Sequence, residues 1–108
     1  MPTDRRSGLR YALHARVVFG WRDAGGQQRE SRGHTRDVAQ KGTFIVALEC
    51  PPKGAAVKLS IFLPVTAGEK KMVRMDADGS VMRAERPVGQ PYLNGFAVSH
   101  ARMNLFGG

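Results

Sequence analysis

Apolar residues recur at every second position in four separate stretches of the chain. These stretches run from Leu13 to Trp21, Val57 to Leu63, Val73 to Val81 and Phe96 to Val98. A period of two gives a β-strand one apolar face, whereas a helix needs apolar residues three or four positions apart. No helical period lies between the stretches. The chain is therefore constrained to an all-β fold with antiparallel strands.

The pattern predicts six strands, at residues 13–21, 28–36, 43–48, 57–63, 72–84 and 94–100. Asp23 to Gln27 contains two adjacent glycines, which admit the positive φ values of a hairpin turn. Gly79 lies within the longest predicted strand and indicates a bulge or a bend at a barrel corner. Short strands of this kind favour a small antiparallel barrel or sandwich, and we expect a six-stranded β-barrel. Ala101 to Phe106 is compatible with a short C-terminal helical turn.

A chain of 108 residues suffices for one domain with one modest core. We expect a flexible, arginine-rich N-terminal arm at residues 1–11, the barrel at 12–100 and a tail at 101–108. The apolar runs are too short to cross a bilayer, and the N-terminus leads into no apolar signal segment, so membrane insertion is not expected. The single cysteine, Cys50, agrees with a reducing compartment, and the cytoplasm is the expected location.

The net charge of +8 favours an anionic partner such as a nucleotide, a nucleic acid, an acidic protein surface or an anionic lipid. Residues 1–42 hold nine lysines or arginines against four acidic residues, and eight of the nine are arginines. Guanidinium groups bind phosphates with two hydrogen bonds and stack on flat rings. A GC-rich genome would give the same arginine bias, so composition alone leaves both explanations open.

Two polar segments are candidates for a binding site. Arg5, Arg6 and Arg10 lie near the N-terminus, and Asp37 and Gly42 lie in a polar turn predicted between the second and third strands. Asp37 offers a fixed carboxylate, and Gly42 offers a backbone position that takes φ > 0 or allows a close approach. An anionic ligand that carries a ring would fit between the two segments. The same residues also suit ordinary roles as a solvated tail and a turn.

No catalytic or metal-binding arrangement is evident in the sequence. His14, His34 and His100 are far apart along the chain, and none has a carboxylate at metalloprotease spacing. Asp76 and Asp78 would share one face of a strand, but their neighbours are basic, which is typical of a solvated face. There is no glycine-rich phosphate loop and no nucleophile elbow. We therefore predict a binding module rather than an enzyme, with no metal and no cofactor.

The two polar segments resemble the motifs of the PilZ domain family, which are bacterial receptors for cyclic di-GMP. Arg6-Ser7-Gly8-Leu9-Arg10 matches the family's Arg-x-x-x-Arg motif. Asp37-Val38-Ala39-Gln40-Lys41-Gly42 matches Asp/Asn-x-Ser-x-x-Gly, except that Ala39 stands where the family usually has serine. Gly79 to Arg83 and Gly95 to Val98 are also similar to family patterns. The resemblance extends over nearly the whole chain.

The resemblance implies a β-barrel that binds cyclic di-GMP and has no catalysis of its own. Arg6 and Arg10 would bind phosphate and stack against guanine, and Asp37 would accept hydrogen bonds from a guanine edge. Gly42 would keep the turn tight. Binding would order the arginine arm, and the changed surface would signal to an unidentified downstream protein in the regulation of motility or biofilm formation.

Ala39 removes one neutral hydrogen bond, which costs about 0.5–1.5 kcal/mol, or up to roughly tenfold in affinity. Binding is expected to weaken but to persist, because the charged contacts are individually stronger. Arg5 and Arg36 lie next to the motifs and would add positive charge without a fixed contact.

Two other functions remain open. One is a degenerate PilZ-like module that binds a motility or secretion partner without nucleotide, which Ala39 favours and the two motif arginines oppose. The other is an OB-like barrel that binds nucleic acid, suggested by the net charge of +8. Such a barrel needs exposed aromatic rings, and only Tyr11, Trp21 and Tyr92 are candidates, so nucleic acid is the less expected partner. The remaining aromatic residues of the strands are expected in the core, namely Phe19, Phe44, Phe62 and Phe96.

Overall fold

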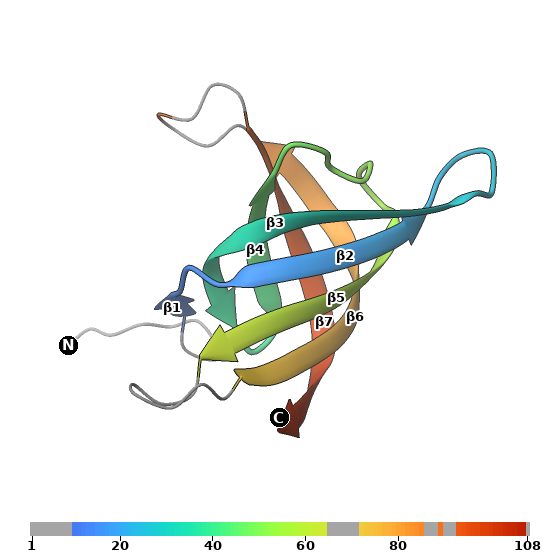
Figure 1. Ribbon diagram of the computed structural model, residues 1–108. Helices are drawn as coiled ribbons and strands as arrows, with labels where there is room; N and C mark the ends of the chain where they lie inside the picture. The colour runs from blue at the N-terminus through green and yellow to red at the C-terminus, as the bar shows by residue number, and fades with distance from the viewer. Residues whose placement is uncertain (1–9, 65–71, 86–88, 90–92, 108) are drawn as a thin grey trace.

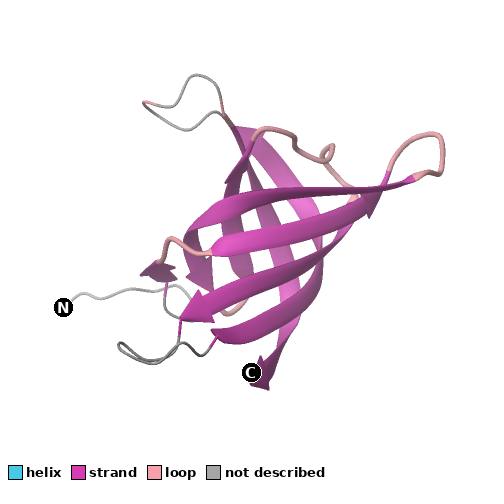
Figure 2. Ribbon diagram, viewed as in Figure 1, coloured by secondary structure: helices cyan, strands magenta, loops and turns pink. Residues whose placement is uncertain are grey.

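The computed structural model describes residues 10–64, 72–85, 89 and 93–107. Every regular element in these ranges is a β-strand (Figure 2). The strands are β1 (Arg10–Ala12), β2 (Arg16–Arg22), β3 (Gln28–Ala39), β4 (Gly42–Ala47), β5 (Ala56–Pro64), β6 (Met72–Glu85) and β7 (Asn94–Gly107). The described ranges accordingly contain no helix of the length and apolarity that a membrane span requires. The predicted all-β class is confirmed.

Strands β2 to β7 close into an antiparallel barrel (Figure 1). Neighbours follow the order β3-β2-β5-β6-β7-β4, and β3 also pairs with β4, which closes the ring. The predicted six-stranded barrel is confirmed. The short strand β1 is added to β3, with Arg10 paired with Ala39 and Ala12 paired with Asp37. Arg10 and Tyr11, which the sequence analysis assigned to a flexible arm at residues 1–11, are therefore part of the sheet.

The C-terminal segment extends β7 beyond the predicted strand. A short helical turn was predicted for Ala101 to Phe106, but these residues belong to β7, and Met103 to Phe106 pair with the first half of β6, where Met75 lies opposite Leu105. The prediction of a helical turn was wrong. Main-chain hydrogen bonds to a long neighbouring strand decide the conformation here, and that neighbour lies far away in the sequence.

The core is filled by the alternating residues of the barrel strands. Phe19 and Phe96 are completely buried, and their ring centroids lie 5.0 Å apart in an edge-to-face arrangement that aromatic pairs prefer. Trp21 stacks on Phe19 with the centroids 5.7 Å apart. Trp21 is therefore a core residue and offers no exposed ring for stacking on a nucleic acid base. Of the other two candidates, Tyr11 belongs to β1, and Tyr92 lies outside the described residues.

Phe62 departs from the predicted core. Its neighbour Ile61 points inward and is completely buried, so Phe62 must point to the outer face of β5. There its half-buried ring lies 5.9 Å from the guanidinium carbon of Arg16. The prediction that Phe62 belongs to the core was wrong, because the strand alternation assigns it to the opposite face.

The predicted irregularity at Gly79 is confirmed. The register between β6 and β7 shifts between Ala77 and Gly79, as a bulge requires. A Cβ atom at Gly79 would lie 2.2 Å from the carbonyl oxygen of Ser99. Glycine is therefore needed where β6 crosses closely over β7.

Strand β3 carries a second irregularity at Arg36. Thr35 is paired with Ile45 and Asp37 with Phe44, so Arg36 is an extra residue without a partner position on β4. In a regular strand Arg36 and Asp37 would point to opposite faces, but a bulge redirects side chains. Thr35 and Val38 are buried, and both residues between them face outward.

Thr35 also holds the bend where the chain passes from β1 into β2. Its buried hydroxyl accepts a hydrogen bond from the Ala15 amide at 3.0 Å and donates one to the Leu13 carbonyl. The Leu13 amide in turn donates to the Arg36 carbonyl at 3.1 Å. These bonds direct β1 along the last residues of β3.

Replacing Thr35 with valine is expected to loosen this bend while the barrel stays folded. Valine has nearly the same shape but leaves the Ala15 amide and the Leu13 carbonyl without partners, at about 1–3 kcal/mol for a buried unsatisfied group. Amide hydrogen exchange should accelerate at Leu13 and Ala15 far more than at Phe19. Thr35→Ser keeps the hydroxyl and serves as the control. Unchanged exchange at Ala15 in the valine variant would contradict this role.

Candidate functional site

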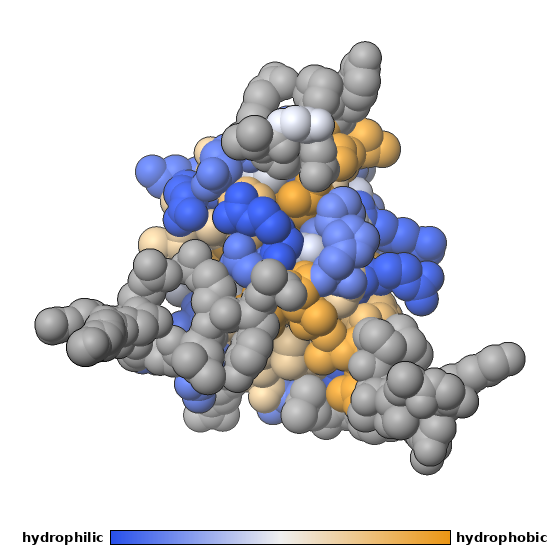
Figure 3. All heavy atoms as spheres, turned by 90° about the vertical axis from the view of Figure 1, so that its left-hand side faces the viewer, coloured by the Kyte–Doolittle hydropathy of each residue, from blue (hydrophilic) through white to orange (hydrophobic). Residues whose placement is uncertain are grey.

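A shallow pocket of about 330 Å³ lies on the outer surface where β3, β4, β6 and β7 meet. Its volume is at the lower end of the range for small-molecule sites. The lining includes four of the predicted site residues, namely Arg36, Asp37, Ala39 and Gly42. Seen from the side in Figure 3, the barrel surface has hydrophobic residues directly beside strongly hydrophilic ones.

The N-terminal residues of the predicted site are only partly described. The backbone of Arg10 is paired with that of Ala39, which lines the pocket. Arg5 and Arg6 lie outside the described residues. Within the described part of the chain, the structure thus brings the end of the first motif next to the second motif.

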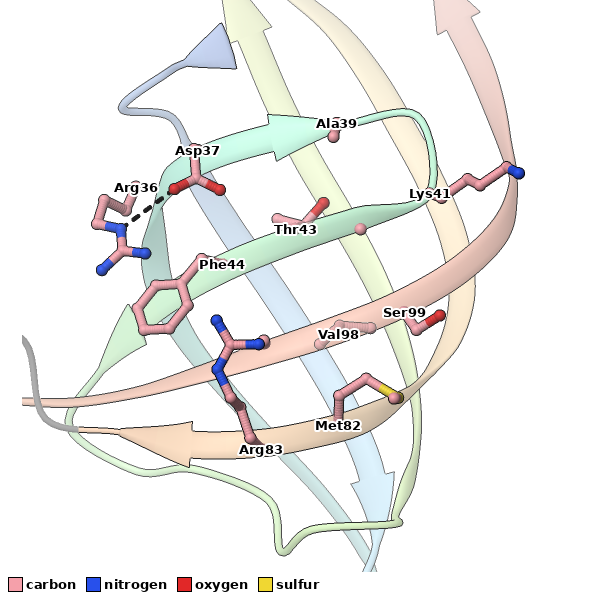
Figure 4. Close-up of a pocket in the computed structure, with 12 residues that line it drawn as sticks. Arg36, Asp37, Ala39, Lys41, Thr43, Phe44, Met82, Arg83, Val98 and Ser99 are labelled. Atoms are coloured by element: carbon pink, nitrogen blue, oxygen red, sulfur yellow. Dashed lines mark hydrogen bonds and ion pairs between the residues drawn. The ribbon is translucent and has the colours of Figure 1, made fainter. Parts of the chain in front are cut away.

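Two bulges form opposite walls of the pocket, and β4 and β7 form its floor. On β3, the bulge turns both Arg36 and Asp37 outward. On β6, the register with β7 shifts between Val81 and Arg83, so Met82 and Arg83 are both exposed. Figure 4 shows Arg36 and Arg83 on the two sides of Phe44. Each wall therefore contributes one arginine.

Arg36 makes two contacts inside the pocket. Its guanidinium carbon lies 3.8 Å from the centroid of the Phe44 ring, which is a close cation–π contact. Its Nε lies 3.2 Å from Oδ2 of Asp37 (Figure 4). The sequence placed Asp37 in a turn, but it lies within β3, and only the bulge allows its carboxylate to meet the neighbouring arginine.

A glycine on β7 makes room for the Phe44 ring. A Cβ atom at Gly95 would lie 2.6–2.7 Å from two carbon atoms of that ring. The sequence assigned Phe44 to the core, and the ring is buried, but Phe44 is paired with the outward-facing Asp37 and does not belong to the central core cluster. Its ring lies on the outer face of the barrel, where it lines the pocket under Arg36. The absence of a side chain at Gly95 therefore helps to set the position of the ring.

Gly42 contributes space rather than an unusual backbone conformation. The turn between β3 and β4 consists of Gln40 and Lys41, and Gly42 is the first residue of β4. In the described ranges a positive φ occurs only at Gly26, Gly54 and Gly89. A Cβ atom at Gly42 would lie 3.2 Å from the Val98 carbonyl oxygen, so a larger residue would press on β7. Of the two roles that the sequence allowed, the close approach is the one observed.

A buried histidine ties this turn to β7. The main-chain amide of His100 donates a hydrogen bond to the Lys41 carbonyl at 3.0 Å, and its Nε2 lies 2.9 Å from the Thr43 hydroxyl. Burial lowers the pKa of His100, which favours the neutral imidazole. Sequence reasoning did not find this role, because a single histidine near the end of a strand gives no sign of its partner.

The other two histidines, which are distant in sequence, lie together. The ring centroids of His14 and His34 are 4.2 Å apart. Burial, together with the charge of His14, lowers the pKa of His34. No cluster of three or more histidine, cysteine or acidic residues suited to a metal ion occurs in the described part of the chain.

Two carboxylates and the cysteine lie outside the pocket, in surroundings typical of residues without a chemical role. They are Asp76, Asp78 and Cys50. Asp76 lies 3.1 Å from Nε of Arg74, and Asp78 is exposed, as expected for a solvated face. Burial and the nearby charge of Glu49 raise the pKa of Cys50 to about 11, so its thiol stays protonated at neutral pH. A thiol in this state is a poor nucleophile.

Comparison with known proteins gives a likeness at the level of the fold. No protein-family model matches the sequence, and no curated protein matches it. A similar solved structure is that of the Bacillus subtilis inhibitor of motility (MotI/DgrA), with a TM-score of 0.71 and 15% sequence identity. The match covers 94% of this chain and 45% of that chain. At this identity the likeness shows a shared barrel fold, and this chain spans less than half the length of that neighbour.

Proposed function

We propose that this domain is a cyclic di-GMP receptor that has no catalytic activity and passes the binding signal to a partner protein. The observation that carries the proposal is the pairing of β1 with the end of β3. Arg10, the last residue of the Arg-x-x-x-Arg motif, lies opposite Ala39, and Ala12 lies opposite Asp37. The last residue of the first motif is thus paired with the second motif, and Asp37, Ala39 and Gly42 of that second motif line one pocket.

The chemistry of the pocket suits such a ligand. Arginine binds phosphate oxygens with two parallel hydrogen bonds, and Arg6 and Arg10 would supply these bonds. The carboxylate of Asp37 accepts hydrogen bonds and would bind the adjacent N–H donors on the edge of guanine. Gly42 keeps the first residues of β4 close to β7. Arg5 would add positive charge beside the first motif.

Signalling would follow from the arginine arm. In our proposal the ligand bridges the arm and the barrel, orders the arm, and so presents a new surface to a protein partner in the cytoplasm. The similar solved structure belongs to an inhibitor of motility. By analogy of fold, we propose that the partner here also acts in motility or in a related surface behaviour.

Calorimetric titration with cyclic di-GMP at physiological salt tests the proposal. We expect saturable binding with a micromolar or lower Kd. Asp37→Ala should weaken it roughly 10–150-fold, because a hydrogen bond to a charged group contributes about 1.5–3 kcal/mol. Asp78→Ala removes the same charge from the exposed face of β6 and should change the affinity little. No saturable binding to the unmodified domain would refute the proposal.

A second candidate is a protein-interaction module that does not bind nucleotide. The methyl group of Ala39 lines the pocket where the family motif places a hydroxyl, and this observation favours the second candidate. If titration shows no binding of cyclic di-GMP but a motility or secretion protein is captured by the domain, this candidate replaces the first.

A further inference from the structure

We propose that Arg36 occupies the guanine position of the pocket in the ligand-free domain, and that the ligand must displace it. Arg36 is then a specificity-determining residue, since only a base that replaces its contacts can enter. The inference rests on the proposed function, because it concerns the same pocket and the same ligand.

The contacts of Arg36 are of the same two kinds that a guanine base would make, one with an aromatic face and one with a carboxylate. A guanidinium group and the N1–C2–N2 edge of guanine are both flat, and both present adjacent N–H donors. The guanidinium of Arg36 lies 3.8 Å from the centroid of the Phe44 ring, and its Nε lies 3.2 Å from Oδ2 of Asp37. An aromatic face and a carboxylate edge together make a site for a flat group with neighbouring donors.

The bulge in β3 explains why an arginine reaches this position. Arg36 is the extra residue between Thr35 and Asp37, so its side chain and that of Asp37 leave the strand on the same side. The side chain of Arg36 is 47% exposed and that of Asp37 only 18%. The side chain of Arg36 is therefore the more accessible of the two, and moving it would leave the side chains of the barrel interior in place.

Displacement of Arg36 leaves the pocket with positive charge for the ligand phosphates. Arg83 stands on the opposite wall, where its Nε lies 3.1 Å from the Glu85 carboxylate. Lys41 also lines the pocket. Arg36 itself, once displaced, remains beside the pocket on the exposed side of the bulge.

This arrangement selects among bases by their donors. Guanine carries two adjacent N–H donors that can replace the Arg36 contact with Asp37, and its ring can replace the contact with Phe44. Adenine has a single amino donor beside ring acceptors, so it cannot make both hydrogen bonds to a carboxylate. Cyclic di-AMP is therefore expected to bind much more weakly than cyclic di-GMP.

The test is titration of cyclic di-GMP into the unmodified domain and into the Arg36→Ala and Arg22→Ala variants. Arg22 is an exposed arginine at the far end of β2, where it donates a hydrogen bond to the Gly26 carbonyl, so its removal costs the same charge away from the pocket. We expect Arg36→Ala to bind about three- to thirtyfold more tightly than Arg22→Ala, the range for one exposed cation–π contact plus one exposed ion pair. Equal or weaker binding by Arg36→Ala would overturn the inference.

A spectroscopic measurement reports on Arg36 directly. In the ligand-free domain the Nε–H resonance of Arg36 should show a ring-current shift from Phe44, and this shift should disappear on saturation with cyclic di-GMP. Arg36→Lys identifies the resonance and, by keeping the charge but losing the flat group, should also bind more tightly than the unmodified domain. A ring-current shift that persists in the complex would overturn the inference about Arg36 but would leave the proposed function standing. Absence of binding to all variants would instead refute the proposed function, and this inference with it.

Discussion

Replacing both Arg6 and Arg10 with alanine is expected to lower the affinity for cyclic di-GMP by more than about a hundredfold. Each arginine would make charge-assisted hydrogen bonds to phosphate, and such bonds contribute about 1.5–3 kcal/mol each. Two of them together amount to at least about 3 kcal/mol, or more than two powers of ten in Kd. Calorimetric titration at physiological salt measures the change, and thermal unfolding of the variant shows that the barrel is intact.

The control for this variant removes two arginines that lie elsewhere. Arg22 and Arg32 are exposed on β2 and β3, outside the pocket lining. The double variant Arg22→Ala, Arg32→Ala loses the same net charge, and at physiological salt distant charges are largely screened. We expect less than a tenfold change in its affinity. Equal losses in both double variants would mean that overall charge, rather than the motif, holds the ligand.

Phe96→Ala is expected to lower the free energy of unfolding by about 3–5 kcal/mol, the usual range for truncation of a buried phenylalanine. Phe96 is 0% exposed and packs edge-to-face on Phe19, so its removal leaves a cavity in the centre of the barrel. Urea unfolding followed by tryptophan fluorescence measures the change, because Trp21 lies in the same core. A loss below about 1 kcal/mol would contradict the assignment of Phe96 to the centre of the core.

Leu48→Ala provides the comparison for Phe96→Ala. Leu48 is also a large apolar residue, but it is 73% exposed. Truncation of an exposed side chain usually changes stability by no more than about 0.5 kcal/mol. The contrast between the two variants separates burial from the mere loss of apolar atoms.

The barrel could be predicted from the sequence because its strands keep a strict period of two over most of their length. The alternation from Leu13 to Trp21 fixes which face of β2 enters the core, and Gly79 marks a bend. The extension of β7 could not be predicted in the same way. Residues Ala101 to Phe106 take their conformation from β6, and pairing with a distant strand is invisible to a local pattern.

Some residues of the candidate site could also be predicted from the sequence. The motif resemblance identified Asp37, Ala39 and Gly42, which the structure places around one pocket. It did not identify Phe44 or Arg83 as lining residues, because their positions depend on the bulges. Arg5 and Arg6 lie outside the described residues, so their placement remains a prediction of the sequence.

The bulges did leave a sign in the sequence. Counting by twos from the buried Thr35 assigns the charged Asp37 to the core and the apolar Val38 to the surface, which is the reverse of what each side chain prefers. The same conflict arises after the buried Val81, where Arg83 would point inward. A charged residue on the expected core face, beside an apolar residue on the expected solvent face, indicates one inserted residue.

The bulges in β3 and β6 allow the pocket residues to change independently of the residues that form the barrel interior. Each inserted residue, Arg36 in β3 and Met82 in β6, is taken up locally, so the strands on both sides keep their pairing. Mutations at these two positions alter what the rim offers to a ligand while the interior residues stay as they are. Single substitutions at the rim are therefore expected to change the chemistry of the pocket surface with little effect on whether the protein folds.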